Sequence, residues 1–166
     1  MRLKPTAAVQ LAFGLLVPLL LMEHVVGSRV IPAMFDFEAT YYYSLSFLWL
    51  NDFSFWKQTA LIFIVWTHLC VGLHFWLRVK PMFEKCEALF YAFAVVIPLL
   101  GWLGFIQAGK LVERMAATPG WLTGTRMGLK QAPQDELQAI LDFMPFQIGI
   151  FLAILASVFV ARYLRR

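Results

Sequence analysis

Long apolar runs separated by polar or aromatic loops form the dominant pattern of this 166-residue chain. Four runs each hold 17 or more residues without Lys, Arg, Asp or Glu, close to or above the length that a membrane-crossing helix needs. Lipid offers backbone groups no hydrogen-bond partners, so such runs must be helical, and the alternation of a membrane β-barrel is absent from them. The pattern predicts an all-α membrane protein with four transmembrane helices in a bundle, at about 6–26, 57–79, 86–109 and 142–163.

The loop after the first run is long and aromatic. From Phe35 to Trp56 it reads FDFEATYYYSLSFLWLNDFSFW, and its apolar core, Tyr41 to Leu50, is too short to span a membrane. Clustered Tyr, Phe and Trp favour a helix that lies at the membrane interface or covers the mouth of a pocket, predicted here at about 38–50. The alternative is an ordinary belt of aromatic anchors.

The loop before the last run combines turn formers with a helix start signal. Pro119-Gly120, Gly124 and Gly128 interrupt regular structure. The following stretch, QAPQDELQAILDFM, places Asp135 and Glu136 in the first turn of a helix, where negative charge complements the helix dipole. A capped helix is therefore predicted to lead into the last span.

Composition indicates the same class of protein. Hydrophobic residues make up 61% of the chain, charged residues make up 14%, and the mean hydropathy is +0.71. A soluble domain of this size carries more charge, so residues 1–166 are predicted to form one membrane domain in contact with the lipid bilayer. The net charge of +4 does not indicate nucleic-acid binding, because the basic residues lie at the ends of the runs. The first run is too long for a signal peptide, and no cleavage site follows it.

The basic residues favour both termini on the cytoplasmic side. With that orientation eight Lys and Arg residues lie inside and six lie outside. The inner set includes the short 78–85 loop and the C-terminal cluster. A multi-pass membrane protein with both ends in the cytoplasm is therefore predicted.

The three histidines, His24, His68 and His74, all lie within or at the edge of the apolar runs. Ionisable side chains at membrane depth are costly and usually functional, although a histidine that hydrogen-bonds a neighbouring helix is the structural alternative. Neutral imidazole is a common axial ligand of b-type haem held between helices. It also suits a proton relay or a hydrogen bond to a quinone.

Depth along the helices separates the roles of the histidines. At about 1.5 Å per residue, His24 lies about 27 Å along the first helix, His68 about 18 Å along the second, and His74 about 9 Å further. His68 and His74 point about 120° apart and do not share a face. His24 and His68 differ in depth by roughly 10 Å, which places them poorly for ligating one iron. Haem binding would therefore need histidines from a second copy of the chain or from another membrane subunit.

Residues near the histidines fit haem binding. Gly72 lies one turn from His68 and Gly27 lies three residues from His24, and each would let a flat macrocycle approach the backbone. Arg29 and Arg78 lie near the two membrane surfaces, where haem propionates could find cationic partners. Ordinary interfacial anchoring is the alternative role for both arginines.

Three stretches of the sequence resemble a known family. They are LLVPLLLMEHVVGSRV, YYYSLSFLWL and VWTHLCVGLHFWLRVKPMFEKCEALFYAFAVVIPLL. They are similar to the second part of succinate dehydrogenase-like dihaem cytochrome b membrane anchors, which in bacteria occur fused through a [2Fe–2S] ferredoxin-like module to class III adenylate cyclase domains. The similarity covers nearly the whole chain, and HVVGSR and GLHFWLR are its most specific parts.

The resemblance implies a bacterial inner-membrane protein in which His24 and His68 are axial ligands of haem iron. His74 would then support a propionate or quinone site. The family anchor has two earlier spans, each with a histidine, and this sequence lacks them together with the ferredoxin and cyclase modules. The resemblance therefore implies that the chain is a fragment of a larger anchor, or that a second copy or a separate subunit supplies the remaining ligands. A ferredoxin-like or cyclase protein is implied as a further partner.

These observations predict a haem b-binding membrane anchor that carries electrons to or from quinone or senses the quinone redox state. The alternative is a haem-free anchor or receptor domain that transmits a signal to a cytoplasmic partner such as an adenylate cyclase. A third hypothesis, a proton relay through His68 and His74, is weakened by the lack of Asp and Glu in the middle of the spans. The sequence shows no nucleophile with a base, no paired carboxylates at depth and no phosphate loop, so enzymatic activity would belong to a partner.

Overall fold

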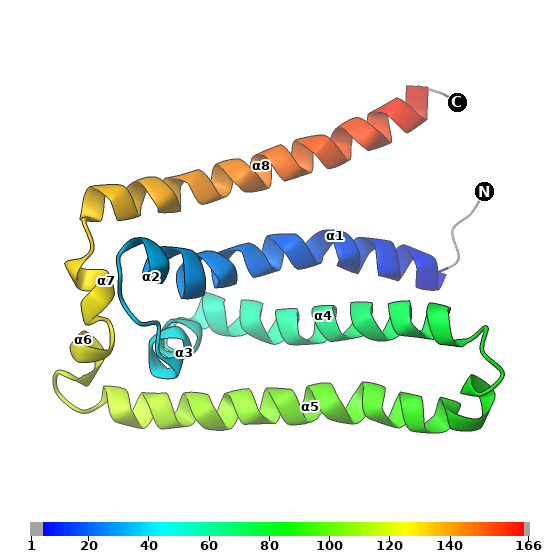
Figure 1. Cartoon of the computed structure of the whole chain (residues 1–166), viewed down its shortest axis with the longest axis horizontal. Helices are drawn as coiled ribbons and strands as arrows, with labels where there is room; N and C mark the ends of the chain where they lie inside the picture. Colours follow the sequence, from blue (N-terminus) through cyan, green and yellow to red (C-terminus); the bar gives the residue numbers. More distant parts are fainter. Residues whose placement is uncertain (1–4, 165–166) are drawn as a thin grey trace.

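A computed structural model describes residues 5–164 of the chain, and all regular elements within that range are helices. Four of them, α1, α4, α5 and α8, are long (Figure 1). In chain order the elements are α1 (Pro5–Val25), the π-helical turn η1 (Val26–Val30), α2 (Ile31–Met34), α3 (Tyr41–Trp49), α4 (Asp52–Leu77), α5 (Phe83–Ala116), α6 (Trp121–Thr125), α7 (Met127–Gln131) and α8 (Gln134–Leu164). The predicted all-helical class is confirmed.

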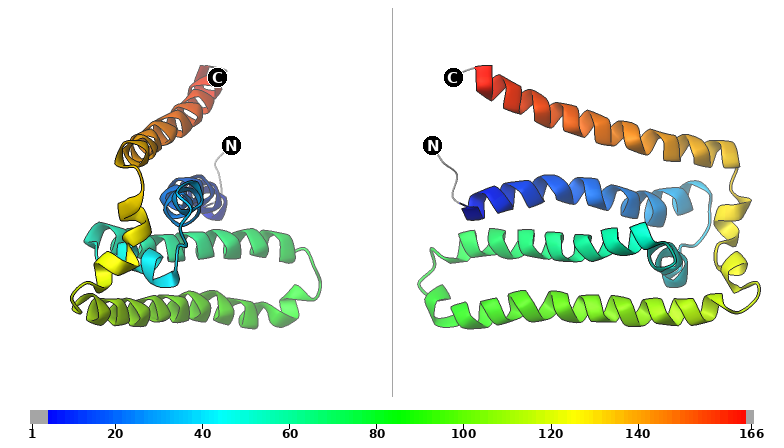
Figure 2. Two further views of the ribbon diagram at one scale, coloured as in Figure 1. Left: turned by 60° about the vertical axis from the view of Figure 1, so that its left-hand side comes forward. Right: turned by 180° about the vertical axis from the view of Figure 1, so that it is seen from behind.

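The long helices alternate in direction, and α4 packs between α1 and α5 (Figure 1). The last helix, α8, runs back beside α1 and diverges from it towards its C-terminal end, as the two further views also show (Figure 2). α1 begins and α8 ends at the end of the bundle where α4 turns into α5. α3, α6 and α7 gather at the opposite end, which we call the cap end.

Three helical stretches are long and apolar enough to cross a membrane: Pro5–Met34, Asp52–Leu77 and Phe83–Ala116. At most 6% of the residues in the most apolar window of each stretch are buried inside the protein. These windows therefore present apolar side chains outward, as contact with lipid requires. The three stretches contain most of the first three predicted spans. The fourth predicted span lies in α8, which is helical but is not one of the three stretches found among the described residues, so four spans are not confirmed.

Side-chain caps explain where α3 and α4 begin. Thr40 Oγ1 accepts a hydrogen bond from Tyr43 N at 3.2 Å, and Asn51 Oδ1 accepts one from Ser54 N at 2.9 Å. Both caps satisfy N–H groups that the first turn of a helix leaves without partners. The aromatic segment predicted at 38–50 is thus a separate nine-residue helix joined to α4 by a short link.

Aromatic side chains of the first loop pack on glycines from the second half of the chain. The indole ring of Trp49 lies against Gly109 of α5, where a Cβ atom would overlap the ring. The ring of Phe37 occupies the corresponding space at Gly128 of α7. Trp49 also makes an edge contact with Phe105, with 5.6 Å between the ring centroids. These contacts fasten α3 and its preceding turn across the cap end.

The segment between α5 and α8 is built from turns and short helices, as its glycines and proline predict. Gly120 adopts a φ of +81°, which a residue with a side chain rarely does, at the start of α6. α8 begins at Gln134, and Asp135 and Glu136 occupy its first turn as expected from the sequence. This segment turns the chain across the cap end before α8 runs back.

Candidate functional site

A cavity of about 500 Å³ lies at the cap end, bounded by residues of α1, η1, α2, α3, α4, α7 and α8. Apolar side chains form much of its wall, and several polar groups interrupt them. The polar lining residues are Glu23, His24, Ser28, Tyr43, Ser44, Ser54, Lys57 and Gln58. A cavity with apolar walls and a few convergent polar groups is typical of a site for a cofactor or small ligand.

His24 is the histidine that lines this cavity, and it lies one residue before the end of α1. Its side chain is exposed, and no hydrogen bond to its imidazole occurs among the residues that the structure describes. Gly27 lines the same cavity, and a Cβ atom at this position would meet nothing within 4 Å. The predicted association of His24 with Gly27 on one surface is therefore seen in the structure.

The backbone just after His24 widens into the π-helical turn η1. Here the hydroxyl of Ser28 donates to the carbonyl oxygen of His24, four residues earlier. A π-helical turn is rare and often occurs at functional sites, because it changes which side chains face a given direction. The turn separates His24 from Ile31, and both residues line the cavity.

Glu23 and Lys57 form an ion pair at the same cavity. The Lys57 side chain is 17% exposed, whereas that of Glu23 is 47% exposed. The ammonium group also lies 5.7 Å from the ring centroid of Phe53. Nothing in the local sequence indicates that Lys57 points into a cavity.

His68 lies at a different place, between α4 and α1. Its Nδ1 is 3.1 Å from the carbonyl oxygen of Gln10, which can only accept, so Nδ1 is the donor. In the neutral ring this hydrogen bond leaves the lone pair on Nε2. The imidazole packs against Gly14, where a Cβ atom would come within 2.8 Å of Cε1.

Gly72, predicted to admit a macrocycle beside His68, is instead in contact with Gln10. A Cβ atom at Gly72 would lie 2.9 Å from Gln10 Nε2. Gln10 Oε1 is buried without a hydrogen-bond partner among the described residues. Gln10, Gly14, His68 and Gly72 thus form a polar contact between α1 and α4.

The structure does not bring His24 and His68 together. His68 lies level with Gln10 and Gly14, and ten residues of helix separate Gly14 from His24. At about 1.5 Å per residue this spacing corresponds to about 15 Å along the axis of α1. One iron cannot bind both imidazoles across that separation.

His74 lies at the other end of the bundle in a group of aromatic rings. Its ring stacks on Tyr91 with 6.2 Å between centroids and meets Phe83 edge-on at 5.6 Å. Its Nδ1 is buried without a partner among the described residues. Aromatic contacts account for the position of His74.

The two predicted arginines lie apart from the cavity. Arg29 is exposed in η1 and is not among the residues that line the cavity. Arg78 is exposed at the C-cap of α4, where its guanidinium lies 5.0 Å from the ring centroid of Phe75. Its location at the end opposite the cap separates it from His24 by the length of the bundle.

Arg126, which the sequence analysis did not identify, holds α3 in place beside the cavity. Its Nε donates to Ser46 Oγ at 3.0 Å, and its Nη2 donates to the Ser46 carbonyl oxygen at 2.8 Å. The guanidinium also lies 3.8 Å from the ring centroid of Phe47, a cavity residue. Burial lowers the pKa of Arg126, and burial raises the pKa of the nearby Tyr43, against an opposing effect of the Arg126 charge. Residue 126 and residue 46 are 80 positions apart, so no local sequence signal reports this contact.

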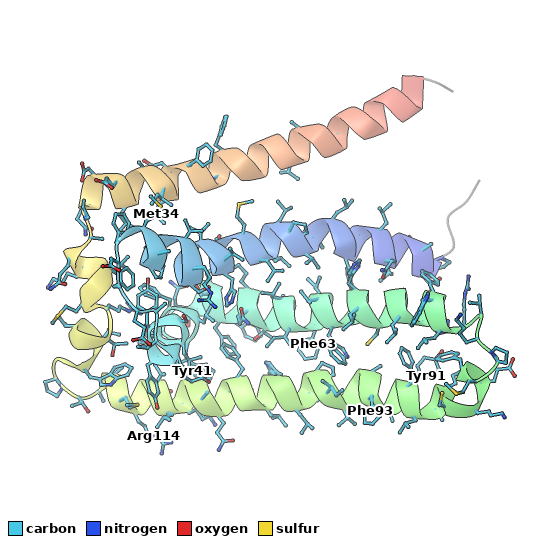
Figure 3. The ribbon with its side chains drawn as sticks, viewed as in Figure 1. Met34, Tyr41, Phe63, Tyr91, Phe93 and Arg114 are labelled. Carbon is cyan, nitrogen blue, oxygen red and sulfur yellow. The ribbon has the colours of Figure 1, made fainter. Side chains whose placement is uncertain are left out.

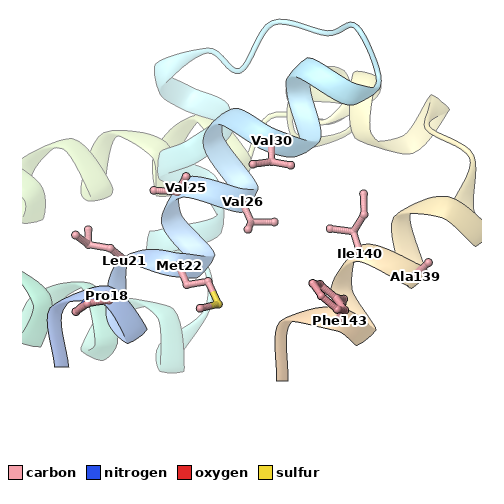
Figure 4. Close-up of a pocket in the computed structure, with 9 residues that line it drawn as sticks. All are labelled: Pro18, Leu21, Met22, Val25, Val26, Val30, Ala139, Ile140 and Phe143. Atoms are coloured by element: carbon pink, nitrogen blue, oxygen red, sulfur yellow. The ribbon is translucent and has the colours of Figure 1, made fainter. Parts of the chain in front are cut away.

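A second hollow lies between α1 and α8 and is lined only by apolar residues (Figure 4). It is open and has a volume of about 760 Å³. Val25, Val26 and Val30 come from the α1 side, and Ile140 and Phe143 face them from α8 (Figure 4). Without a polar group this groove has no means of orienting a reactive ligand, and hydrocarbon suits it chemically.

Within residues 5–164, no three His, Cys, Asp or Glu side chains are grouped so that they could hold a metal ion alone. Comparison of the chain with protein-family models, with curated proteins and with solved structures finds no match. His24 at the cap-end cavity and His68 between α1 and α4 lie in different surroundings.

Proposed function

We propose that this chain is a haem b-binding membrane subunit that carries electrons to or from quinone, or senses the quinone redox state. It would be related to the succinate dehydrogenase-like dihaem cytochrome b anchors that its sequence resembles. The observation that supports this proposal best is the cap-end cavity, in which the imidazole of His24 and the open backbone at Gly27 line one space. In this proposal His24 is an axial ligand of the haem iron.

The chemistry of the cavity suits a haem group. Its apolar wall, which includes Leu20, Phe47 and Leu141, matches the hydrocarbon face of a macrocycle. Its polar residues include one cation, the partly buried Lys57, which can pair with a carboxylate. The His24 imidazole makes no competing hydrogen bond among the described residues, so its nitrogens are free to bind a metal.

His68 is proposed as the axial ligand of a second haem. Its Nδ1–H bond to the Gln10 carbonyl is the arrangement that fixes the ring and leaves Nε2 available in metal-ligating histidines. The separation of about 15 Å along α1 means that His24 and His68 would serve different irons. Each iron would take its remaining ligand from a homodimeric partner or from a second membrane subunit.

When bound, haem b supplies one-electron transfer between its ferrous and ferric states. The chain would contribute the imidazoles, a low-polarity wall that limits water, and hydrogen bonds that set the orientation of each imidazole. Quinone would approach near the haem edge. A ferredoxin-like or cyclase protein would receive the electron or the signal.

The proposed setting is the bacterial inner membrane, with both termini in the cytoplasm. α8 would then be the fourth span, since it contains the long uncharged run 143–161. α3 would lie at the outer interface, where its three tyrosines and Trp49 suit the headgroup region. The cap-end cavity would consequently lie towards the outer surface.

The proposal is tested by the absorption spectrum of the full chain purified from haem-sufficient cells. We expect a Soret band that shifts on reduction and that weakens in both His24→Ala and His68→Ala. His74→Ala is the matched control and should keep the band. A mass measurement in detergent would report the oligomer and the number of haems together, and protein that stays colourless would refute haem binding.

One observation favours the alternative, a haem-free membrane anchor that transmits a signal. The imidazole of His68 is already accommodated by Gly14 and hydrogen-bonded to α1, as in a structural contact between helices. In that case both wild-type protein and His68→Ala would be colourless. The substitution would then change the stability of the bundle alone.

A further inference from the structure

We propose that Lys57 binds a haem propionate in the His24 cavity, and that this carboxylate takes the place of Glu23 when the ligand binds. The inference rests on the proposed function, because it concerns the ligand of the same cavity. It assigns the charged contact to a lysine instead of the two arginines expected from the sequence. Among the lining residues that the structure describes, Lys57 is the one Lys or Arg side chain.

The exposures of the ion pair make Glu23 the exchangeable partner. The Lys57 side chain is 17% exposed, so most of it is withdrawn from water and an anion close by stabilises its charge. Glu23 is 47% exposed and can turn outward while its carboxylate stays hydrated. A second carboxylate that enters the cavity can therefore replace Glu23 without leaving a buried charge unpaired.

The position of the pair suits a ligand bound through His24. Glu23 precedes His24 in the chain and contacts the Lys57 ammonium, so the cation and the imidazole meet the same space from α4 and α1. Ser54 and Gln58, from the same first two turns of α4, also line the cavity and can donate hydrogen bonds to a carboxylate. A ligand with an apolar body and a carboxylate at its edge therefore fits both parts of the wall.

The arrangement predicts selectivity for the free acid. A porphyrin with free propionates would bind through its iron and through a charge-assisted hydrogen bond to Lys57. Its dimethyl ester carries the same macrocycle and iron but no anion. The ester would leave the Glu23–Lys57 pair intact and would lack the hydrogen bond to Lys57.

The experiment titrates full-length apoprotein in detergent with haemin and, separately, with haemin dimethyl ester, following the Soret band. We expect Lys57→Met to weaken haemin binding by about tenfold or more, because a charge-assisted hydrogen bond is lost, and to leave ester binding unchanged. Lys57→Arg should restore most of the haemin affinity. Lys80→Met, an exposed lysine at the other end of the bundle, is the matched control.

Glu23→Gln provides the opposite test. Removing the competing carboxylate should tighten haemin binding, lower the melting temperature of the apoprotein and increase the stabilisation that haemin gives. The double variant Glu23→Gln with Lys57→Met avoids an unpaired buried charge and should bind haemin and its ester equally. Haemin and ester that respond alike to Lys57→Met, with both bound at His24, would overturn the role of Lys57. Failure of both porphyrins to bind wild-type protein would instead overturn the proposed function, and this inference with it.

Discussion

The imidazole of His68 in α4 lies against Gly14 of α1, where a Cβ atom would come within 2.8 Å of Cε1. The same ring donates from Nδ1 to the carbonyl oxygen of Gln10 at 3.1 Å. Space and hydrogen bonding at one point of α1 therefore determine how a polar side chain is held between two helices. The absence of a side chain at position 14 is what permits the contact.

The first prediction concerns this contact. Gly14→Ala should displace the His68 ring and lower the free energy of unfolding by about 1–3 kcal/mol, the usual range for overpacking. Gly101→Ala is the matched control, because a Cβ atom at Gly101 in α5 meets nothing within 4 Å. It should change stability by no more than about 1 kcal/mol. Denaturation in detergent, followed by circular dichroism, measures both, and equal stability of the two variants would contradict the contact.

The second prediction concerns the attachment of α3. Gly109→Ala should push the Trp49 indole off α5 and loosen the cap end, because the added methyl group overlaps the ring. We expect increased proteolysis between α2 and α4 in this variant. Gly104→Ala, in the same helix but with open space at its Cβ position, should keep the wild-type cleavage pattern. Identical digestion of both variants would show that Trp49 does not hold the cap.

The third prediction concerns Arg126. Arg126→Met removes both donors to Ser46, a residue with 0% exposure, and should destabilise the protein by about 1.5–3 kcal/mol. Arg126→Lys keeps the charge but not the two-donor geometry, so it should recover only part of the loss. Arg114→Met serves as control because Arg114 is exposed on α5 (Figure 3). Thermal unfolding of the three variants ranks them, and a fully stable Arg126→Met would refute the role of this residue.

The fourth prediction concerns alkaline pH. Burial raises the pKa of Tyr43 in the folded protein, so the folded state holds its proton more tightly than the unfolded chain does. Stability should be unaffected below the ordinary tyrosine pKa of about 10 and should fall as pH rises above it. Tyr43→Phe should reduce this alkaline loss, whereas replacement of the exposed Tyr41 by Phe should not. Denaturation curves at successive pH values between about 8 and 11 measure the difference, and parallel curves for all three proteins would contradict it.

Spacing along a single helix was sufficient to predict part of the fold and part of the candidate site. Uncharged runs predict the long helices, because the requirement for internal backbone hydrogen bonding in lipid leaves no other choice. His24 and Gly27 are three residues apart and line the same cavity, as neighbouring positions on a helix can do. The same reasoning places Asp135 and Glu136 in the first turn of α8.

Contacts between helices could not be predicted in the same way. The rotation and register of α4 against α1 decide that Gln10 meets Gly72, and neither quantity is encoded in the spacing within one helix. No feature of the sequence around Lys57 shows whether this lysine lines a cavity or anchors the helix at the membrane interface. The pairing of Arg126 with Ser46 depends on how two distant loops fold over the same end of the bundle.

The π-helical turn η1 sets how α1 is rotated about the helix axis relative to α2 within the Pro5–Met34 stretch. Each residue advances an α-helix by about 100°, so deletion of one residue from 26–30 would rotate the part that carries His24 by that angle against the part that carries Ile31. Ile31 is 4% exposed at the cap end, and α1 is held on α4 by the contact of His68 with Gly14, so the two parts could not both keep their contacts after this rotation. The length of this turn, to the single residue, is thus a determinant of which surface of the bundle His24 presents.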